Sequence, residues 1–467
     1  MIPVIDVFAG PGGLNEGFAS VVVGDEPLFR IAASFEMESN AVETLVLRST
    51  VRALSTQSQL YEPYREFLDG ELSMSELRGT SDFKKAEAFA RAHVNQIELG
   101  RENREKVASR IHAAIDGHSD WVLVGGPPCQ AYSLVGRSRR AHDPTFAADH
   151  KHFLYKEYLD IIKRFEPPVF VMENVKGLLS ANHNGSAMFE RIMRDLSDDG
   201  KYRIRSLVVD DESPEPADFV IRAEKYNIPQ RRHRIILLGV RDGFGTGVWG
   251  QLKPAAGEVT VAQALVGLGK VLSGVSRNSD PSAWIKAQNE AFHFLSESSI
   301  RNDCKVDSNP KPDEKLERWL THREVGITLH DPRSHMASDL TRYAYLAGLA
   351  EFGEQPKVFE LPPKLRPNHR NIDGAKTPFV DRFKVQRWDR PSSTIASHIS
   401  KDGHYYIHPD PQQMRSLTVR EAARLQTFPD DYYFCGPRTA QYHQVGNAVP
   451  PLLALQIAEQ VAKIFER

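Results

Sequence analysis

The chain has 467 residues, of which 41% are hydrophobic and 26% charged, a composition typical of a folded protein with a large core. Its three cysteines, Cys129, Cys304 and Cys435, are too few for a disulfide framework, and its N-terminus lacks the features of a signal peptide. No apolar run approaches the length of a membrane span, and a net charge of −2 neither favours nor excludes a nucleic-acid partner. We therefore expect a cytoplasmic protein without a membrane anchor.

The first 250 residues alternate short apolar runs with helical patterns, which predicts a parallel α/β sheet. A long, polar and mostly helical stretch, residues 51–117, interrupts this alternation. The predicted strands cover residues 4–8, 31–35, 121–125, 169–172 and 235–240.

The alternation ends at about residue 250, where Pro, Asn, Asp, His and Arg become frequent. This composition indicates a second, smaller domain with irregular structure. Near the end of the chain, residues 419–425 and 450–465 have helical patterns. We predict one domain from residues 1–250 and 436–467, and a second from residues 251–435.

A glycine-rich turn, Phe8–Gly17, joins the first predicted strand to a helix. Its glycines allow a tight turn and a close approach to a ligand, but Asn15 stands where the dinucleotide motif needs its third glycine. Glu36, at the end of the second strand, is placed to bind ribose hydroxyls. The pair favours a nucleoside with a carboxylate-bearing tail over NAD, although an ordinary strand-turn-helix would give the same turn.

Cys129 follows two prolines at the end of the central strand, in the stretch Gly126–Gln130. Open α/β sheets keep their active sites at this edge, so Cys129 is a candidate nucleophile on a rigid support. A buried structural cysteine beside a proline turn would show the same local pattern.

A carboxylate and two arginines complete the candidate site. Glu173 lies at the tip of the strand over residues 169–172, and Arg232 and Arg234 precede the next predicted strand. Taken singly, such a glutamate is usually a cap or a surface ion pair, and such arginines pair with local carboxylates.

Six stretches together, in this order, resemble DNA cytosine-5 methyltransferases of the bacterial restriction-modification type. They are residues 6–13, 126–130, 173–175, 230–234, 390–395 and 444–450. The resemblance covers most of the chain and implies a Rossmann-like, S-adenosylmethionine-dependent sheet domain with a smaller, irregular target-recognition domain.

The resemblance also implies a mechanism. The target cytosine is flipped out of the duplex, and the Cys129 thiolate adds to its carbon 6, so that carbon 5 can accept a methyl group. Glu173 would bind N3 and the amino group of the base, and Arg234 its carbonyl oxygen. Arg232 would help hold the nucleophile loop.

S-adenosylmethionine is the cofactor that the resemblance implies. Glu36 would take its ribose, Met37 would pack on its adenine, and residues from both ends of the chain would line its amino-acid part. The implied cofactor residues are Phe8, Gly10, Gly12, Gly13, Glu36, Met37, Pro128, Asn447 and Val449.

Double-stranded DNA is the implied substrate, bound under a mobile basic loop over residues 131–151 and read by the second domain. The candidate DNA-binding residues are Gln130, Ser133, Arg137, Arg139, Arg140, Arg333, His335 and Arg370. We expect a monomer on DNA, in the bacterial cytoplasm at the nucleoid, with any cognate restriction endonuclease acting as a separate protein.

Two other functions remain open: a transfer-RNA cytosine-5 methyltransferase of the same fold, and a catalytically silent DNA-binding regulator. The large region 251–435 argues against the first, because RNA-acting relatives are compact. The intact set of Cys129, Glu173 and Arg234 argues against the second.

Two further features carry no firm assignment. Residues 51–117 form a longer insert than compact members of the resembled family have, and it could contact DNA or form an oligomer surface. The polar cluster near the C-terminus does not match a closed zinc site, so we expect no metal. Its residues are His398, Lys401, Asp402, His404 and His408.

Overall fold

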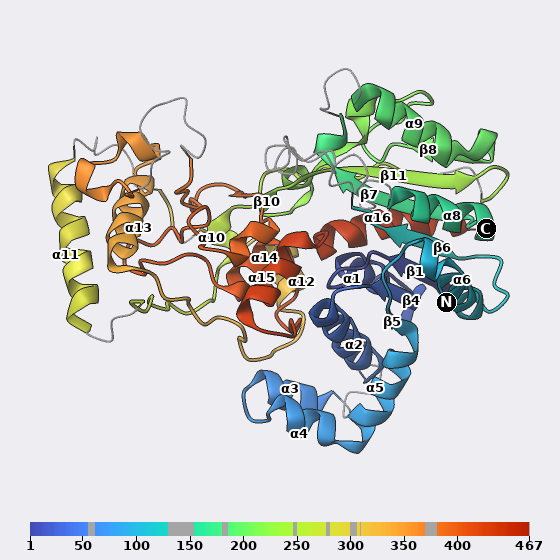
Figure 1. Ribbon diagram of the computed structural model, residues 1–467, viewed down its shortest axis with the longest axis horizontal. Coiled ribbons are helices and arrows are strands. Elements are labelled where there is room, and N and C mark those ends of the chain that lie inside the picture. The colour runs from blue at the N-terminus through green and yellow to red at the C-terminus, as the bar shows by residue number, and fades with distance from the viewer. Residues whose placement is uncertain are drawn as a thin grey trace.

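The structure is a computed structural model (Figure 1). It describes residues 1–54, 61–128, 154–179, 185–245, 250–276, 281–298, 306–308, 310–368 and 381–466.

A mixed, mostly parallel sheet forms the centre of the molecule, in the strand order β5-β4-β1-β6-β7-β11-β8, with β9 also paired to β11. The first five strands in this order run parallel, whereas β11 pairs antiparallel with β7, β8 and β9. Their bounds are β1 Ile2–Val7, β4 Phe29–Glu36, β5 Val94–Gln96, β6 Val122–Gly125, β7 Val169–Val175, β8 Tyr202–Arg205, β9 Val220–Arg222 and β11 His233–Arg241. The predicted α/β fold is confirmed, and the antiparallel edge is the part that the sequence did not reveal.

Helices cover both faces of the sheet because its central strands are apolar on both sides. Val4, Val122 and Val171 face one layer, which includes α1 (Gly13–Ala19) and α16 (Pro451–Phe465). Alternate residues such as Ile5 and Phe170 face the other layer, with α6 (Arg104–Ile115) and α8 (Tyr155–Phe165).

Close contact between α1 and α16 depends on Gly17. A Cβ atom at this position would lie 2.3 Å from the backbone nitrogen of Leu455 and 2.4 Å from the Cβ of Ala454. The helix near the C-terminus therefore lies directly on the helix that follows the glycine-rich turn (Figure 1).

Most of the remaining helices lie in the insert or in the second half of the chain. Helices α3, α4 and α5 of the insert lie beside α2, whereas α11 and α13 pack together at the opposite end of the molecule from the sheet (Figure 1). These helices are α2 Ser39–Leu54, α3 Glu62–Leu68, α4 Met74–Gly79, α5 Ser81–His93, α9 Gly185–Ser197, α10 Val261–Ala264, α11 Pro281–Glu297, α12 Glu314–Leu320, α13 Ala337–Ala350, α14 Val419–Leu425 and α15 Arg438–Asn447. Short strands β2 (Val22–Val23) and β3 (Glu26–Pro27) pair with each other, and β10 (Gln230–Arg231) pairs with β12 (Ser392–Ser393).

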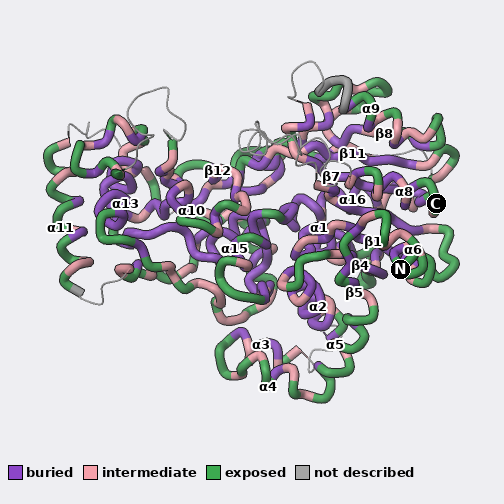
Figure 2. The backbone as a smooth tube through the Cα atoms, in the orientation of Figure 1, coloured by how far each residue is buried: buried purple, intermediate pink, exposed green. Residues whose placement is uncertain are grey.

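Hydrophobic packing runs across residue 435, where the sequence analysis divided the chain. Leu417, Phe428 and Tyr432 belong to the same buried cluster as Val4 and Leu14 of the sheet domain. Figure 2 shows buried backbone both in the sheet and around α15. The division into two domains stays a prediction, and the packing favours placing residues 417–435 with the sheet.

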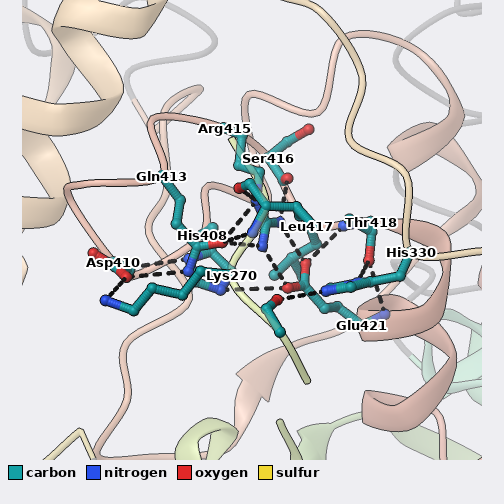
Figure 3. A network of polar contacts seen from close by, with 12 residues as sticks. Lys270, His330, His408, Asp410, Gln413, Arg415, Ser416, Leu417, Thr418 and Glu421 are labelled. Carbon is teal, nitrogen blue, oxygen red and sulfur yellow. Dashed lines mark hydrogen bonds and ion pairs between the residues drawn. The ribbon is translucent and has the colours of Figure 1, made fainter. Parts of the chain in front are cut away.

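A buried network of charges fastens the segment before α14 (Figure 3). Arg415 donates to both carboxylate oxygens of Glu421, at 2.6 and 2.7 Å, and His408 lies 3.4 Å from the same carboxylate. Glu421 also accepts the backbone N–H of Thr418, which caps α14. Arg415 and Glu421 are almost completely buried, so each charge depends on the other.

We expect Glu421→Ala to lower the free energy of unfolding by about 3 kcal/mol, because it leaves the Arg415 charge buried without its partner. Burial would raise the pKa of Glu421, but Arg415 and His408 outweigh it and hold that pKa well below its ordinary value. The stabilisation is therefore fully present above the unfolded pKa of about 4.3, and the difference between variant and wild type should shrink as the pH falls below it. Urea unfolding at pH 7 and at pH 4 measures both effects.

Glu258→Ala is the matched control, because Glu258 pairs with Arg231 at the surface, where both side chains are about half exposed. Its loss should change the free energy of unfolding by less than about 1 kcal/mol. Equal losses in the two variants would contradict the role given to burial.

Candidate active site

The glycine-rich turn between β1 and α1 is hydrogen-bonded to Glu36. One carboxylate oxygen of Glu36 accepts the backbone N–H of Gly10 at 2.8 Å, and the other accepts those of Met37 and Glu38, each at 2.9 Å. Gly10 and Gly12 have φ angles of 55° and 96°, which favour glycine. Because a Cβ on Gly10 would meet nothing within 4 Å, the turn leaves free space at this point.

Residues from the C-terminal region reach the same turn. A Cβ on Gly13 would lie only 2.0 Å from the carbonyl oxygen of Val449, so these two predicted cofactor residues are in direct contact. Asn447 is exposed, and its amide lies 3.3 Å from the ring of His443. Met37 is also exposed, at 55% of its surface, so its apolar side chain is accessible to a ligand.

Two buried acceptors near the turn have no hydrogen-bond partner within the described part of the chain. They are the carboxyl group of Asp6 and the amide oxygen of Asn15, whose amide nitrogen donates to Ser34 at 3.1 Å. Burial raises the pKa of Asp6 well above its ordinary value, and the charge of Glu36 raises it further. Unsatisfied buried acceptors fit a ligand that carries donors or a positive charge. The sequence analysis gave Asp6 no role, although an acidic residue within an apolar strand was a usable signal.

Glu173 and Arg234 meet on neighbouring strands, β7 and β11. The Arg234 Nε lies 2.7 Å from a carboxylate oxygen of Glu173, and both side chains remain partly exposed. The other oxygen of Glu173 would be 2.9 Å from a Cβ on Gly126, which leads into the predicted nucleophile stretch. Asn174 donates to the carbonyl of Pro127 at 3.3 Å. The carboxyl ends of β6 and β7 thus bring the predicted base-binding residues to the start of the Pro-Pro-Cys stretch.

The expectation that Arg232 holds the nucleophile loop stays a prediction, because the residues after Pro128 lie outside the described part of the chain. Arg232 is buried, and its Nη1 donates to the carbonyl oxygens of Ile395 at 2.9 Å and Gly446 at 3.3 Å. Burial lowers the pKa of Arg232 well below its ordinary value, and the charge of Arg234 lowers it further. In the described structure, Arg232 joins two distant segments of the second half of the chain.

The expectation that His335 and Arg333 contact bases stays a prediction, although the structure gives both side chains partners within the protein. His335 is 5% exposed, its Nε2 accepts the backbone N–H of Ser416 at 3.3 Å, and burial lowers its pKa to about 3. Arg333 donates to the carbonyls of Ile399 and Lys401, at 2.7 and 2.9 Å, and stacks 4.1 Å from the ring centre of Tyr442. Within the described residues, both side chains therefore connect separate segments of the second half of the chain.

Several predicted residues fall outside the described part of the chain. These are Cys129, Gln130, Ser133, Arg137, Arg139, Arg140 and Arg370. Pro128 is described and is half-buried at the end of the stretch after β6.

The histidines of the C-terminal cluster have protein partners. His404 Nδ1 pairs with the hydroxyl of Tyr343 at 2.5 Å, and His408 pairs with Glu421. Among the residues that the structure describes, no three His, Cys, Asp or Glu side chains are grouped so that they could hold a metal ion. No helix in the described ranges is long and apolar enough to span a membrane.

Cys435 is expected to be chemically inert in the folded protein. It is 9% exposed, and burial raises its pKa to about 11, so very little thiolate is present at pH 8. Iodoacetamide should leave Cys435 unmodified in the native protein and label it after unfolding in urea, as mass spectrometry of its peptide would show. Equal labelling in both states would contradict this placement.

The fold is similar to that of a solved structure. A prophage-encoded Escherichia coli protein, whose crystal structure carries the description of a DNA modification methyltransferase, matches with a TM-score of 0.54 at 18% identity over 100% of both chains.

The family follows from the sequence. Residues 96–463 match the C-5 cytosine-specific DNA methylases, and the chain belongs to this family. Type II methyltransferase M.Bpa9945I of Bacillus paralicheniformis is 34% identical over 99% of both chains. Type II methyltransferase M1.HphI of Haemophilus parahaemolyticus is 28% identical over 98% of this chain and 86% of its own.

Proposed function

We propose that this DNA cytosine-5 methyltransferase flips a cytosine out of duplex DNA, within one short sequence, and methylates it with S-adenosylmethionine. The observation that carries this proposal is the Glu173–Arg234 pair beside Gly126. It presents a carboxylate and a guanidinium at the strand ends where the Pro-Pro-Cys stretch begins. These are the groups that a cytosine ring needs in order to accept a nucleophile at carbon 6.

The proposed reaction uses the chain's residues as follows. The Cys129 thiolate forms a bond to carbon 6, and the electron pair of the 5,6 double bond moves so that carbon 5 becomes nucleophilic. Glu173 holds the N3 and amino edge of the base, and Arg234 holds its carbonyl oxygen. After carbon 5 has gained a methyl group, it loses its proton, the double bond re-forms and the Cys129 sulfur leaves as a thiolate.

S-adenosylmethionine supplies the methyl group from its sulfonium when it is bound. Glu36, which accepts only backbone N–H groups in the described structure, has lone pairs left for ribose hydroxyls. Met37 offers an exposed apolar side chain to the adenine. The other proposed contacts come from the turn and from the C-terminal region: Phe8, Gly10, Gly12, Gly13, Pro128, Asn447 and Val449.

Duplex DNA would lie under the basic loop over residues 131–151, whose phosphate contacts position the duplex without reading its sequence. The candidates for these contacts are Gln130, Ser133, Arg137, Arg139 and Arg140, and Arg370 is a candidate for reading bases. The relatives named type II methyltransferases support a role in restriction-modification. We further propose that the enzyme is a monomer at the bacterial nucleoid and that any restriction endonuclease is a separate protein.

The test is methyl transfer to unmethylated genomic DNA, with base-by-base mapping of modified cytosines. Carbon-5 methylation within one short repeated sequence would support the proposal and identify the site. Methylation of transfer RNA instead of DNA would move the substrate to RNA. Binding of DNA without any transfer would indicate a silent regulator.

A further inference from the structure

Tyr432, from the second half of the chain, contacts the glycine-rich turn that Glu36 also binds. It is 1% exposed, and its hydroxyl donates to the carbonyl oxygen of Pro11, between Gly10 and Gly12. The same hydroxyl would lie 3.0 Å from a Cβ on Gly12. The turn is therefore fixed at two points: Glu36 accepts the N–H of Gly10, and Tyr432 donates to the carbonyl of Pro11, the next residue.

Buried charges hold Tyr432 in place. The Arg48 guanidinium lies 4.9 Å from the centre of the Tyr432 ring, and it donates to Asp431 at 2.9 Å and to Glu16 at 2.8 Å. Burial would raise the pKa of Asp431, but the charge of Arg48 outweighs it and holds that pKa below its ordinary value. Glu16 belongs to α1, the helix that follows the turn. Arg48 therefore contacts both this helix and Tyr432.

The insert supports the same group of residues. The Tyr64 hydroxyl, on α3, donates to the carbonyl of Asp431 at 2.7 Å. Arg323 donates to the Asp431 carboxylate at 3.0 Å and stacks 4.4 Å from the ring centre of Tyr61, next to α3. Leu68 and Leu77 of the insert pack in one cluster with Cys435. The insert therefore binds the segment that carries Tyr432.

We propose that Tyr432 is a positioning residue for the cofactor, and that α3 of the insert holds it in place through Asp431. This inference rests on the proposed use of S-adenosylmethionine. Tyr432 touches the turn and none of the reacting atoms. Its hydrogen bond fixes Pro11, and both neighbours of Pro11, Gly10 and Gly12, have positive φ angles. The turn therefore already has its binding conformation before the cofactor arrives.

Tyr432→Phe removes this hydrogen bond and little else. Without it, cofactor binding must order the turn, so the affinity falls while the chemical step at saturating cofactor is unchanged. We expect the Kd for S-adenosylmethionine and for S-adenosylhomocysteine, measured by calorimetry without DNA, to rise about fivefold, the equivalent of one hydrogen bond. The KM for the cofactor should rise in parallel, and kcat should stay within about twofold.

Tyr202→Phe is the matched control. Tyr202 is also buried and donates to a proline carbonyl, that of Pro167, at 3.0 Å, but this bond lies at the start of β7, away from the strand ends that carry the turn. The control should lose a similar amount of thermal stability and keep the wild-type Kd. A Tyr432→Phe protein with wild-type Kd, or equal rises in Kd in both variants, would overturn the positioning role.

Tyr64→Phe tests the contribution of the insert. It also tests the positioning role of Tyr432 if the Tyr432→Phe protein does not fold. It releases the Asp431 carbonyl while leaving Tyr432 itself unchanged, and we expect the Kd to rise about twofold to threefold. An unchanged Kd would overturn the part played by the insert. Wild-type protein that binds neither S-adenosylmethionine nor S-adenosylhomocysteine would overturn the cofactor assignment as well. Wild-type protein that binds them, with unchanged affinity in the variants, would overturn the positioning role alone.

Discussion

Cys129→Ser is expected to abolish methyl transfer while the protein stays folded and binds its cofactor. A serine hydroxyl ionises far less readily than a thiol, so it cannot add to carbon 6 of the base, and without that bond carbon 5 is too weak a nucleophile. Transfer of labelled methyl groups to DNA measures the loss. DNA carrying 5-fluorocytosine gives a second measurement, because carbon 5 cannot lose fluorine as it loses a proton. The wild type should become covalently trapped on this DNA, and the variant should not.

Cys435→Ser and Cys304→Ser are the controls for this experiment. Cys435 is buried with a raised pKa, and neither residue belongs to the proposed site, so both variants should transfer methyl groups at close to the wild-type rate. Turnover by Cys129→Ser at the wild-type rate would refute the covalent mechanism. A loss in either control as large as that of Cys129→Ser would refute a single nucleophile.

Glu173→Gln is expected to lower kcat by about a hundredfold or more. The glutamine keeps the volume of the side chain, but its neutral amide cannot exchange a proton with N3 or balance the charge of Arg234, 2.7 Å from the carboxylate. Because the site lies at strand ends and is partly exposed, we expect the fold to tolerate the change. Single-turnover rates on duplex DNA measure the effect without interference from product release.

Glu224→Gln is the matched control for Glu173→Gln. Glu224 is another mostly buried carboxylate, paired at 2.8 Å with His233, the residue beside Arg234. This change should leave kcat within about threefold of the wild type, since the pair orients no reacting group. A Glu173→Gln protein as active as this control would remove Glu173 from the chemistry.

The sheet and the centre of the site could be predicted because they follow from local patterns. Apolar runs located β1, β4, β6 and β7, and parallel strands place their carboxyl ends at one edge. That rule alone brings Glu36 to the glycine-rich turn and Glu173 to the stretch after β6. The antiparallel direction of β11 has no such local signal, since it depends on which neighbour the strand finds.

The parts that were missed depend on contacts between distant segments. Arg232 donates to the backbone carbonyls of Ile395 and Gly446. Both residues belong to stretches that the sequence analysis singled out, but a bond to a backbone carbonyl leaves no side-chain signal of which segments meet. A histidine such as His335 is a reasonable candidate for reading DNA from sequence alone, but in the structure its ring accepts a hydrogen bond from the backbone of Ser416. The structure likewise gives Tyr61 of the insert a contact with Arg323, and Tyr64 a contact with Asp431, which a polar helical composition could not indicate.

The contact between α1 and α16 has a consequence for how the protein is made. Gly17 emerges from the ribosome before most strands of the central sheet, whereas the Ala454 and Leu455 backbone that packs on it emerges only after all of these strands. Until then one apolar face of the nascent sheet lacks the part of its cover that α16 supplies, and contacts of this sequence separation form slowly. Synthesis interrupted before α16 should therefore yield aggregation-prone chains without activity, so a cell would acquire methylation capacity only from translation that has passed this helix.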